Sequence, residues 1–88
     1  MADTAGLSKP TIHLNGTSRY ELERKFDNAR SALLIAYDRL IEAAPHPRDY
    51  YLQGPAAYTK AEHEHQRRLD LIKEVRTELC QILESLGL

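Results

Sequence analysis

Residues 18–44 carry the strongest helical pattern in the chain and read SRYELERKFDNARSALLIAYDRLIEAA. Apolar residues recur there at alternating steps of four and three: Leu22, Phe26, Ala29, Leu33, Ala36, Leu40 and Ala43. A mean period of 3.5 residues is typical of helices that pack almost parallel to a partner helix. The pattern therefore predicts one long helix over about residues 18–44, packed lengthwise against another helix.

Both ends of this helix have recognisable signals. Ser18 and Glu21 match the capping box, in which the serine hydroxyl accepts from the backbone N–H of Glu21 and the glutamate reaches back to the serine N–H. Pro45 ends the helix, because proline lacks the backbone donor and disfavours the helical conformation of the residue before it.

A second helix is expected after a stiff connector. Residues 45–54 read PHPRDYYLQG, and we expect Tyr50 and Tyr51 to fold back on the end of the helices. Pro55 then suits the first turn of a helix over about residues 55–86, which Gly87 ends. The expected inward positions of this helix are Ala61, His65, Arg68, Ile72, Val75, Leu79, Ile82 and Leu86.

The first residues do not fit this helical pattern. Residues 1–10 are small and polar, and we interpret them as a disordered leader. Apolar and polar residues alternate over residues 11–14, which predicts a short extended segment, and Asn15-Gly16 predicts a turn. The fold class is therefore all-α: a long two-helix hairpin over residues 11–88 with a short extended N-terminal segment.

The chain has more apolar surface than one hairpin can cover. Residues 33–37 are five consecutive apolar residues, which point all round a helix, whereas one partner helix covers a single stripe. A chain of 88 residues is marginal by itself, and its single cysteine, Cys80, excludes an internal disulfide. We therefore expect a homo-oligomer.

Charge and hydropathy exclude several partners. The formal net charge of −1 argues against a protein that binds nucleic-acid polymers, since such proteins usually carry a strong basic excess. No apolar run approaches the roughly 20 residues of a membrane span, and the N-terminus lacks an export signal. A cytoplasmic protein without membrane contact is expected.

No pattern in the chain predicts catalysis or a cofactor. A Gly-rich phosphate loop, a nucleophile elbow and a catalytic dyad are all missing from the sequence, so we do not expect an enzyme. His63 and His65 diverge on a helix, and neither has a second ligand at helical spacing, so we expect a solvated face and no metal site. Cys80 is expected to behave as a small apolar residue.

Two places remain as candidate binding sites. Arg19, Tyr20, Arg24 and Lys25 lie in the first turns of the helix expected over residues 18–44, where free N–H groups and the helix dipole also favour an anion. An aromatic ring with flanking cations suits a nucleobase and a phosphate. Arg76 lies beside Val75 on an apolar stretch, where an oligomer could gather symmetric copies. The alternatives are that Tyr20 covers the helix start and that Arg76 extends to solvent.

The chain also resembles a known family. The segment TIHLNGTS at residues 11–18, the early Tyr20, the long first helix and the Ala-x-x-Glu-His-x-x-Arg run at residues 61–68 are similar to phage and prophage anti-CBASS cyclic-oligonucleotide sponges. The resemblance covers about residues 11–88. It implies a small helical protein that assembles into homo-hexamers and binds cyclic di- or trinucleotide messengers without cleaving them.

The resemblance also implies roles for particular residues. Tyr20 takes the position of the base-stacking tyrosine in the dinucleotide pocket, and Arg76 that of the arginine in the trinucleotide pocket. The phosphate-binding lysine of the family falls at Ile35, so Lys25 or Arg39 would have to replace it. The hydroxyl expected one turn after the arginine falls at Cys80.

These observations lead to one functional hypothesis and one rival. The hypothesis is sequestration of cyclic oligonucleotide second messengers in the host cytoplasm, which antagonises CBASS-type antiphage signalling. The candidate ligand-binding residues are Tyr20, Arg24, Lys25, Arg76 and Cys80. The rival is a phage or bacterial helical adaptor that binds and inhibits a host protein through its apolar helix face.

Overall fold

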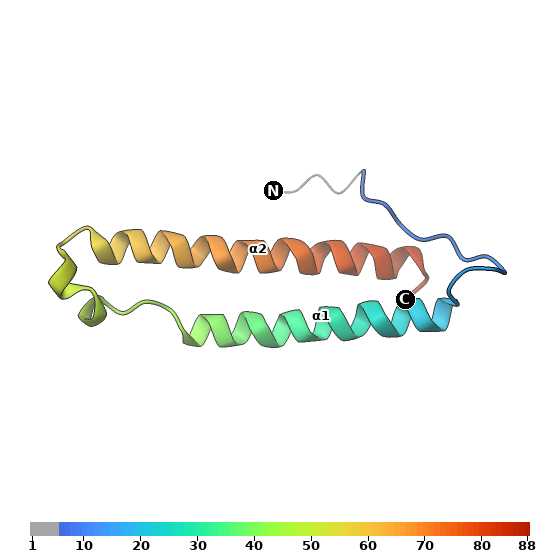
Figure 1. The fold of residues 1–88 in the computed structure, drawn as a ribbon, viewed down its shortest axis with the longest axis horizontal. Helices are drawn as coiled ribbons and strands as arrows, with labels where there is room; N and C mark the ends of the chain where they lie inside the picture. Colours follow the sequence, from blue (N-terminus) through green and yellow to red (C-terminus); the bar gives the residue numbers. More distant parts are fainter. Residues whose placement is uncertain (1–5) are drawn as a thin grey trace.

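A computed structural model describes residues 6–88 and shows an all-helical hairpin in that range (Figure 1). Helix α1 spans Arg19–Glu42 and helix α2 spans Ala57–Ser85. The connector between them contains two short 3-10 turns, η1 at Pro47–Asp49 and η2 at Tyr51–Gln53. The predicted all-α helical hairpin is thus confirmed.

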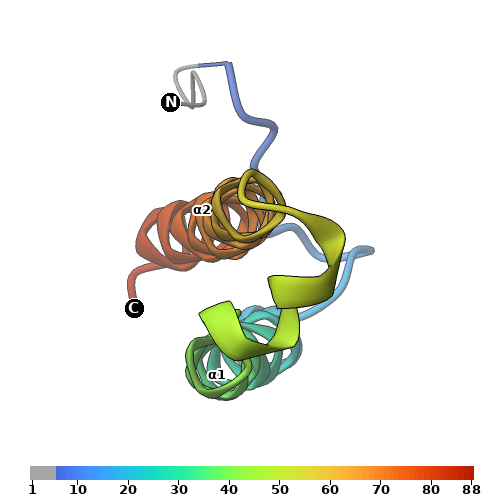
Figure 2. The same ribbon diagram turned by 90° about the vertical axis from the view of Figure 1, so that its left-hand side faces the viewer.

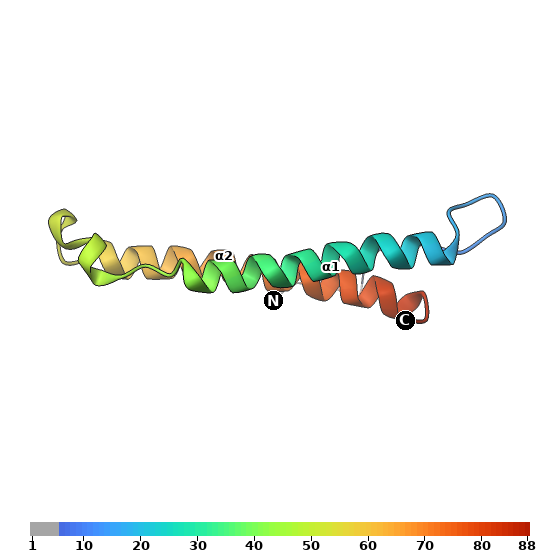
Figure 3. The same cartoon turned by 90° about the horizontal axis from the view of Figure 1, so that it is seen from below.

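The hairpin is long and thin, with extents of 61 × 24 × 17 Å. Viewed along its length, α1 and α2 lie side by side as one layer (Figure 2), and the helices stay together over most of their length (Figure 3). At 1.5 Å per residue the helices are about 36 and 44 Å long. Each helix therefore has one neighbour and exposes most of its circumference.

The cap expected at the start of α1 is half formed. The Ser18 hydroxyl accepts from the backbone N–H of Glu21 at 3.1 Å, as predicted. The Glu21 carboxylate pairs with Arg24 at 3.3 Å and with Lys25 at 3.7 Å. Two nearby cations compete with the Ser18 N–H for this carboxylate, because charge-assisted bonds are the stronger ones.

The C-terminal end of α2 closes against the start of α1. Gly87 adopts φ 96°, a conformation that ends helices and favours glycine, and its N–H donates to the carbonyl of Glu84 at 3.0 Å. The Arg19 guanidinium donates to the carbonyl of Leu86. A Cβ atom at Gly87 would come within 3.0 Å of that guanidinium, so glycine is favoured there for two reasons.

The connector folds back only in part. Tyr50 is half-buried, as expected, but Tyr51 is 73% exposed, so it does not cover the end of the hairpin. Its neighbour Leu52 is fully exposed. Pro55 lies in the turn that precedes α2, which begins at Ala57 and not at residue 55.

Residues 6–18 begin on the side of α2 that faces away from α1 (Figures 1 and 2). They run beyond this end of the hairpin and then turn back to the start of α1. Within them the expected turn is present, since the N–H of Gly16 donates to the carbonyl of His13 at 3.1 Å. Residues 11–14 form no strand, and Leu14 is 98% exposed. The expected disordered leader, residues 1–10, lies partly outside the described residues.

The core of the hairpin lies almost entirely on α2. The buried side chains form two groups, Ala61, His65 and Leu69 near the connector and Ile82, Leu83 and Leu86 near the C-terminus. Helix α1 is described over its whole length and has no buried residue. Along α2 between these groups no side chain is fully buried.

The inward face of α2 differs from the predicted one at four positions. Leu69 and Leu83 are buried, whereas Arg68 and Val75 are exposed. The buried residues near the connector recur at steps of four. The predicted face instead assumed a period of 3.5, which drifts away from the true face of a helix with 3.6 residues per turn.

Large apolar side chains remain uncovered on both helices: Leu34, Ile35 and Ile41 on α1, and Leu71 and Val75 on α2. Ile35, in the middle of the five-residue apolar run, is 61% exposed. Uncovered apolar surface of this kind is typical of a contact with another chain. The exposed side chains therefore agree with self-assembly of the hairpin, which itself stays a prediction.

Candidate functional site

The first candidate group lies at the start of α1. Tyr20 is 73% exposed, so its ring does not cover the helix start. Arg24 lies one turn later on the same side and is also exposed. Arg24 and Lys25 share the Glu21 carboxylate, but exposed ion pairs of this kind contribute little, so an incoming phosphate can compete for both cations.

The second candidate, Arg76, is half-buried. It shares a side of α2 with the inward residues Leu69 and Leu83, seven residues before and after it, and that side faces α1. Its Nε atom is buried and has no hydrogen-bond partner among the residues that the structure describes. A buried donor without a partner costs roughly 1–3 kcal/mol, so Arg76 has an unmet need for an acceptor.

A second arginine, Arg30, lies at nearly the same level of the hairpin. The bonds from Arg19 to Leu86 and from His65 to Leu40 fix one antiparallel register, which places Arg30 opposite the turn that contains Arg76. Arg30 pairs with Asp27 on its own helix. The neighbouring Cys80 thiol, and then the Asp27 carboxylate, raise the pKa of Arg30 above its ordinary value.

We call Arg30, Arg76 and Cys80 the central cluster. Arg76 and Cys80 are one helical turn apart on α2, and the structure brings Arg30 to them from α1. Arg30 was missed in the sequence, although a signal was present: it lies four residues after Phe26 and three before Leu33, on the inward side of α1.

The two candidate groups are separate sites. The register places Tyr20 near the end of α2, about nine residues, or roughly 14 Å, along the axis from Arg76. The structure therefore joins Tyr20 with Arg24 and Lys25, and Arg76 with Cys80, but keeps the two sets apart within one chain. Ile35 points away from both, as an exposed residue on α1.

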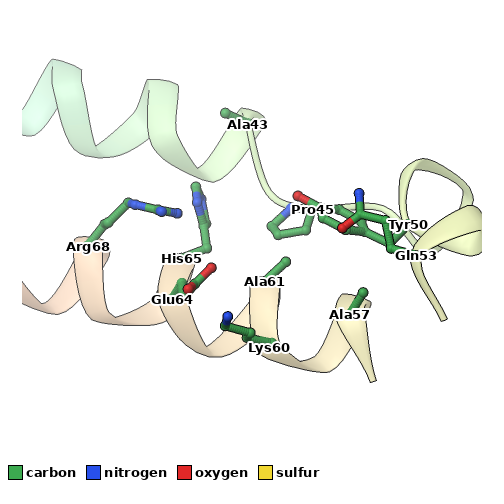
Figure 4. Close-up of a pocket in the computed structure, with 10 residues that line it drawn as sticks. All are labelled: Ala43, Pro45, Tyr50, Gln53, Ala57, Lys60, Ala61, Glu64, His65 and Arg68. Carbon is green, nitrogen blue, oxygen red and sulfur yellow. The ribbon is translucent and has the colours of Figure 1, made fainter. Parts of the chain in front are cut away.

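A cavity of about 260 Å³ opens at the connector end of the hairpin (Figure 4). Its polar wall comes from α2, with side chains of Lys60, Glu64, His65 and Arg68. Tyr50 and Gln53 close it from the connector, and Ala43 and Pro45 from the end of α1. We call it the loop-end cavity. None of its charged residues had been selected as a site from the sequence.

The structure decides between two sequence predictions for His65. Helical spacing placed it on the inward face, and this is confirmed because His65 is buried. The solvated face expected for the two histidines holds for His63, which is exposed, and is wrong for His65. The Nε2 atom of His65 lies 2.6 Å from the carbonyl oxygen of Leu40, and a carbonyl only accepts, so Nε2 carries the proton and donates. Burial is tolerated because this bond serves one of the last carbonyls of α1.

An aromatic hollow lies next to this cavity. Tyr50, Tyr51 and Tyr58 line it together with Pro47, Gly54 and Pro55. The rings of Tyr50 and Tyr58 are 6.4 Å apart and tilted by 52°. The Tyr58 hydroxyl donates to Glu62 at 3.0 Å, and this bond raises the pKa of Tyr58 above its ordinary value.

Comparisons with protein families, with characterised proteins and with solved structures find no match. In the described range 6–88, no three His, Cys, Asp or Glu side chains are grouped so that they could hold a metal ion. The described helices also lack a segment long and apolar enough to cross a membrane. The function is therefore inferred from the three groups of side chains above.

Proposed function

We propose that this protein sequesters cyclic oligonucleotide second messengers, without converting them, and thereby antagonises CBASS-type antiphage signalling. The observation that supports this most is the central cluster. Among the described residues Arg76 has a buried Nε without a partner, and the helix register places Arg30, with Asp27 as its paired carboxylate, at the same level of the hairpin. A ligand with several phosphates would supply the missing acceptors, because guanidinium–phosphate bonds are among the strongest hydrogen bonds in proteins.

Assembly would bring several copies of the central cluster to one ligand. We propose a homo-hexamer, in which copies of Arg76 from related subunits meet at a symmetry axis. Their mutual repulsion would be relieved by a ring of phosphates, and three phosphates suit a threefold axis. Cys80 would lie beside that ligand, where its thiol is a weaker donor than the hydroxyl of the similar family.

The start of α1 would form a second pocket type. The exposed Tyr20 ring offers a stacking surface for a base. Arg24 lies about one turn after it, and Lys25, which shares the Glu21 carboxylate with Arg24, follows directly, so both could meet phosphates. This pocket would suit a cyclic dinucleotide. Lys25 is the better replacement for the family lysine than Arg39, because Arg39 lies far along α1 and pairs with Glu42 at 3.2 Å.

The adaptor function remains as a second candidate, and the exposed Leu34, Ile35 and Ile41 support it. The same side chains would bind a helix of a host protein if the hairpin did not assemble with itself. Such an adaptor would have no need for the polar central cluster, so we favour the nucleotide function.

Calorimetry against a panel of cyclic di- and trinucleotides tests the proposal. We expect Arg76→Ala to abolish trinucleotide binding and to keep dinucleotide binding, while the unliganded protein stays as stable or becomes more so. Tyr20→Ala should weaken dinucleotide binding by roughly 1–3 kcal/mol, the usual range for a base stacked on an aromatic ring. The melting temperature of Tyr20→Ala should be nearly unchanged, because the ring is exposed.

Arg67→Ala is the matched control, because it removes an exposed arginine from the same helix. It should leave the affinities for cyclic dinucleotides and cyclic trinucleotides unchanged. If no cyclic nucleotide binds, or if Arg67→Ala and Arg76→Ala weaken binding equally, the proposed function is wrong.

A further inference from the structure

The loop-end cavity has two cations without a counter-charge. Among the described residues, neither Lys60 nor Arg68 has a carboxylate oxygen within 4 Å, although Glu64 lies between them on the same helix. Lys60 and Arg68 give the wall two positive charges, and Glu64 gives it one negative charge. The cavity therefore has an excess of positive charge in a chain whose formal net charge is −1.

The residues of this wall come from one sequence run. Ala61, Glu64, His65 and Arg68 are spaced by three, one and three residues, which places them on one side of a helix. All four line the cavity, where Ala61 lies beside Pro45, His65 points toward the end of α1, and Arg68 lies on the side of His65 away from the connector (Figure 4). Neither Tyr20 nor Arg76 contributes to it, so the cyclic-oligonucleotide sites leave this run without a role.

We propose that the loop-end cavity is a separate binding site for a small phosphorylated ribose, of the size of one nucleotide. Arg68 and Lys60 would hold the phosphate, since both are free to donate charge-assisted bonds. Glu64 would accept hydrogen bonds from ribose hydroxyls, so the one carboxylate of the wall would also bind the ligand. The Nδ1 atom of His65 is the ring nitrogen left to meet the ligand, because Nε2 already donates to Leu40.

The aromatic side of the cavity supplies the place for a base. Tyr50 is half-buried at the boundary between the cavity and the aromatic hollow, and it lines both. A base attached to the ribose would lie against this ring, next to Tyr58. The ligand thus spans from the cations of α2 to the tyrosines of the connector.

The size of the cavity favours a small ligand. Sites for drug-sized ligands have volumes of about 300–1,000 Å³. A cavity of about 260 Å³ is slightly below that range, which suits one nucleotide better than a cyclic oligonucleotide. This site therefore differs from the proposed messenger sites in both position and ligand size.

Calorimetry on the full chain, with four probes, tests this site: adenosine monophosphate, ribose 5-phosphate, inorganic phosphate and adenosine. We expect the two phosphorylated riboses to bind and adenosine to bind at least about tenfold more weakly, because it lacks the charged partner. Arg68→Gln should lower the affinity for adenosine monophosphate by about tenfold or more. Binding of inorganic phosphate alone, with no gain from the ribose, would overturn the proposed ligand class.

Arg67→Gln is the matched control, since it makes the same change at the adjacent position, outside the cavity. It should leave the affinity for adenosine monophosphate unchanged, and circular dichroism should show that both variants are folded. Equal losses in the two variants would mean general charge attraction and no site. Absence of binding for all four probes would also overturn the proposal.

The test of the loop-end cavity is independent of the proposed cyclic-oligonucleotide sites at Tyr20 and Arg76. Arg68→Gln should keep the affinity for cyclic di- and trinucleotides, and Arg76→Ala should keep the affinity for adenosine monophosphate. Loss of every ligand in both variants would contradict a separate site.

Discussion

At the scale of single residues, His65 and His63 have the same chemistry and opposite environments. His65 is buried and donates to the carbonyl of Leu40, whereas His63 is exposed. The polar neighbours of both histidines predicted a solvated face, whereas helical spacing placed His65 on the inward side. What decides the difference is the position of the last carbonyls of α1, and those come from a segment about 25 residues away in the chain.

We expect His65→Ala to lower the free energy of unfolding by about 1–3 kcal/mol, because it removes a buried hydrogen bond and leaves space at the end of α1. His63→Ala should change it by less than about 0.5 kcal/mol, as exposed substitutions usually do. Urea denaturation of both variants at one protein concentration measures the difference. Equal effects would mean that the bond to Leu40 does not contribute.

Arg76 shows what can be learned about a binding residue without a structure. A long cation on an apolar stretch is visible in the sequence, and the structure places it on the inward side with its Nε unpaired. Cys80 was found through the family resemblance, but Arg30 was missed, because it interrupts an apolar face that predictions treat as continuous. Likewise, the loop-end cavity depends on the path of the connector, which no periodic pattern specifies.

At the scale of elements, the two helices were predictable, whereas the inward face of α2 was predicted only in part. Capping at Ser18, the proline after α1 and Gly87 after α2 are local signals, so the helices could be located to within a few residues. The rotation of α2 is decided by packing against α1. Leu83 is inside and Val75 is outside, the reverse of what the spacing predicted.

A pair of leucines tests this rotation. Leu83 is 1% exposed, and we expect Leu83→Ala to lower the free energy of unfolding by about 2–5 kcal/mol, the usual cost of a cavity in a core. Leu71→Ala makes the same chemical change on the exposed side of α2 and should cost clearly less. Thermal or urea denaturation of the two variants compares them. A larger loss for Leu71→Ala would show that the inward face is assigned wrongly.

At the scale of the whole molecule, the hairpin is one layer thick and α1, over its full described length, buries no side chain completely. A single layer cannot cover Leu34, Ile35 and Ile41, which lie on the free side of α1. Domains usually need two packed layers around a core. A second layer supplied by other copies of the chain would meet this need.

Light scattering at micromolar concentration should therefore give a mass several times 10.1 kDa. Ile35→Glu should dissociate the assembly, because an unpaired charge in an apolar contact costs several kcal/mol. Thr77→Glu adds the same side chain at an exposed polar position of α2 and should leave the mass unchanged. A monomer with full helicity in the unmodified protein would exclude self-assembly.

The two separate groups of buried side chains have a consequence for how the hairpin moves. The connector end of the hairpin is held together by the buried Ala61, His65 and Leu69. The opposite end is held by the buried Leu83 and Leu86 and by the hydrogen bond from Arg19 to Leu86. Helical hairpins usually fray from their free ends, but here the least protected amides should lie midway, around Arg30 and Arg76. Local opening at the midpoint would admit water or a ligand to the buried Nε of Arg76 while the contacts at both ends persist. The hairpin would therefore open first at its centre and not at its ends.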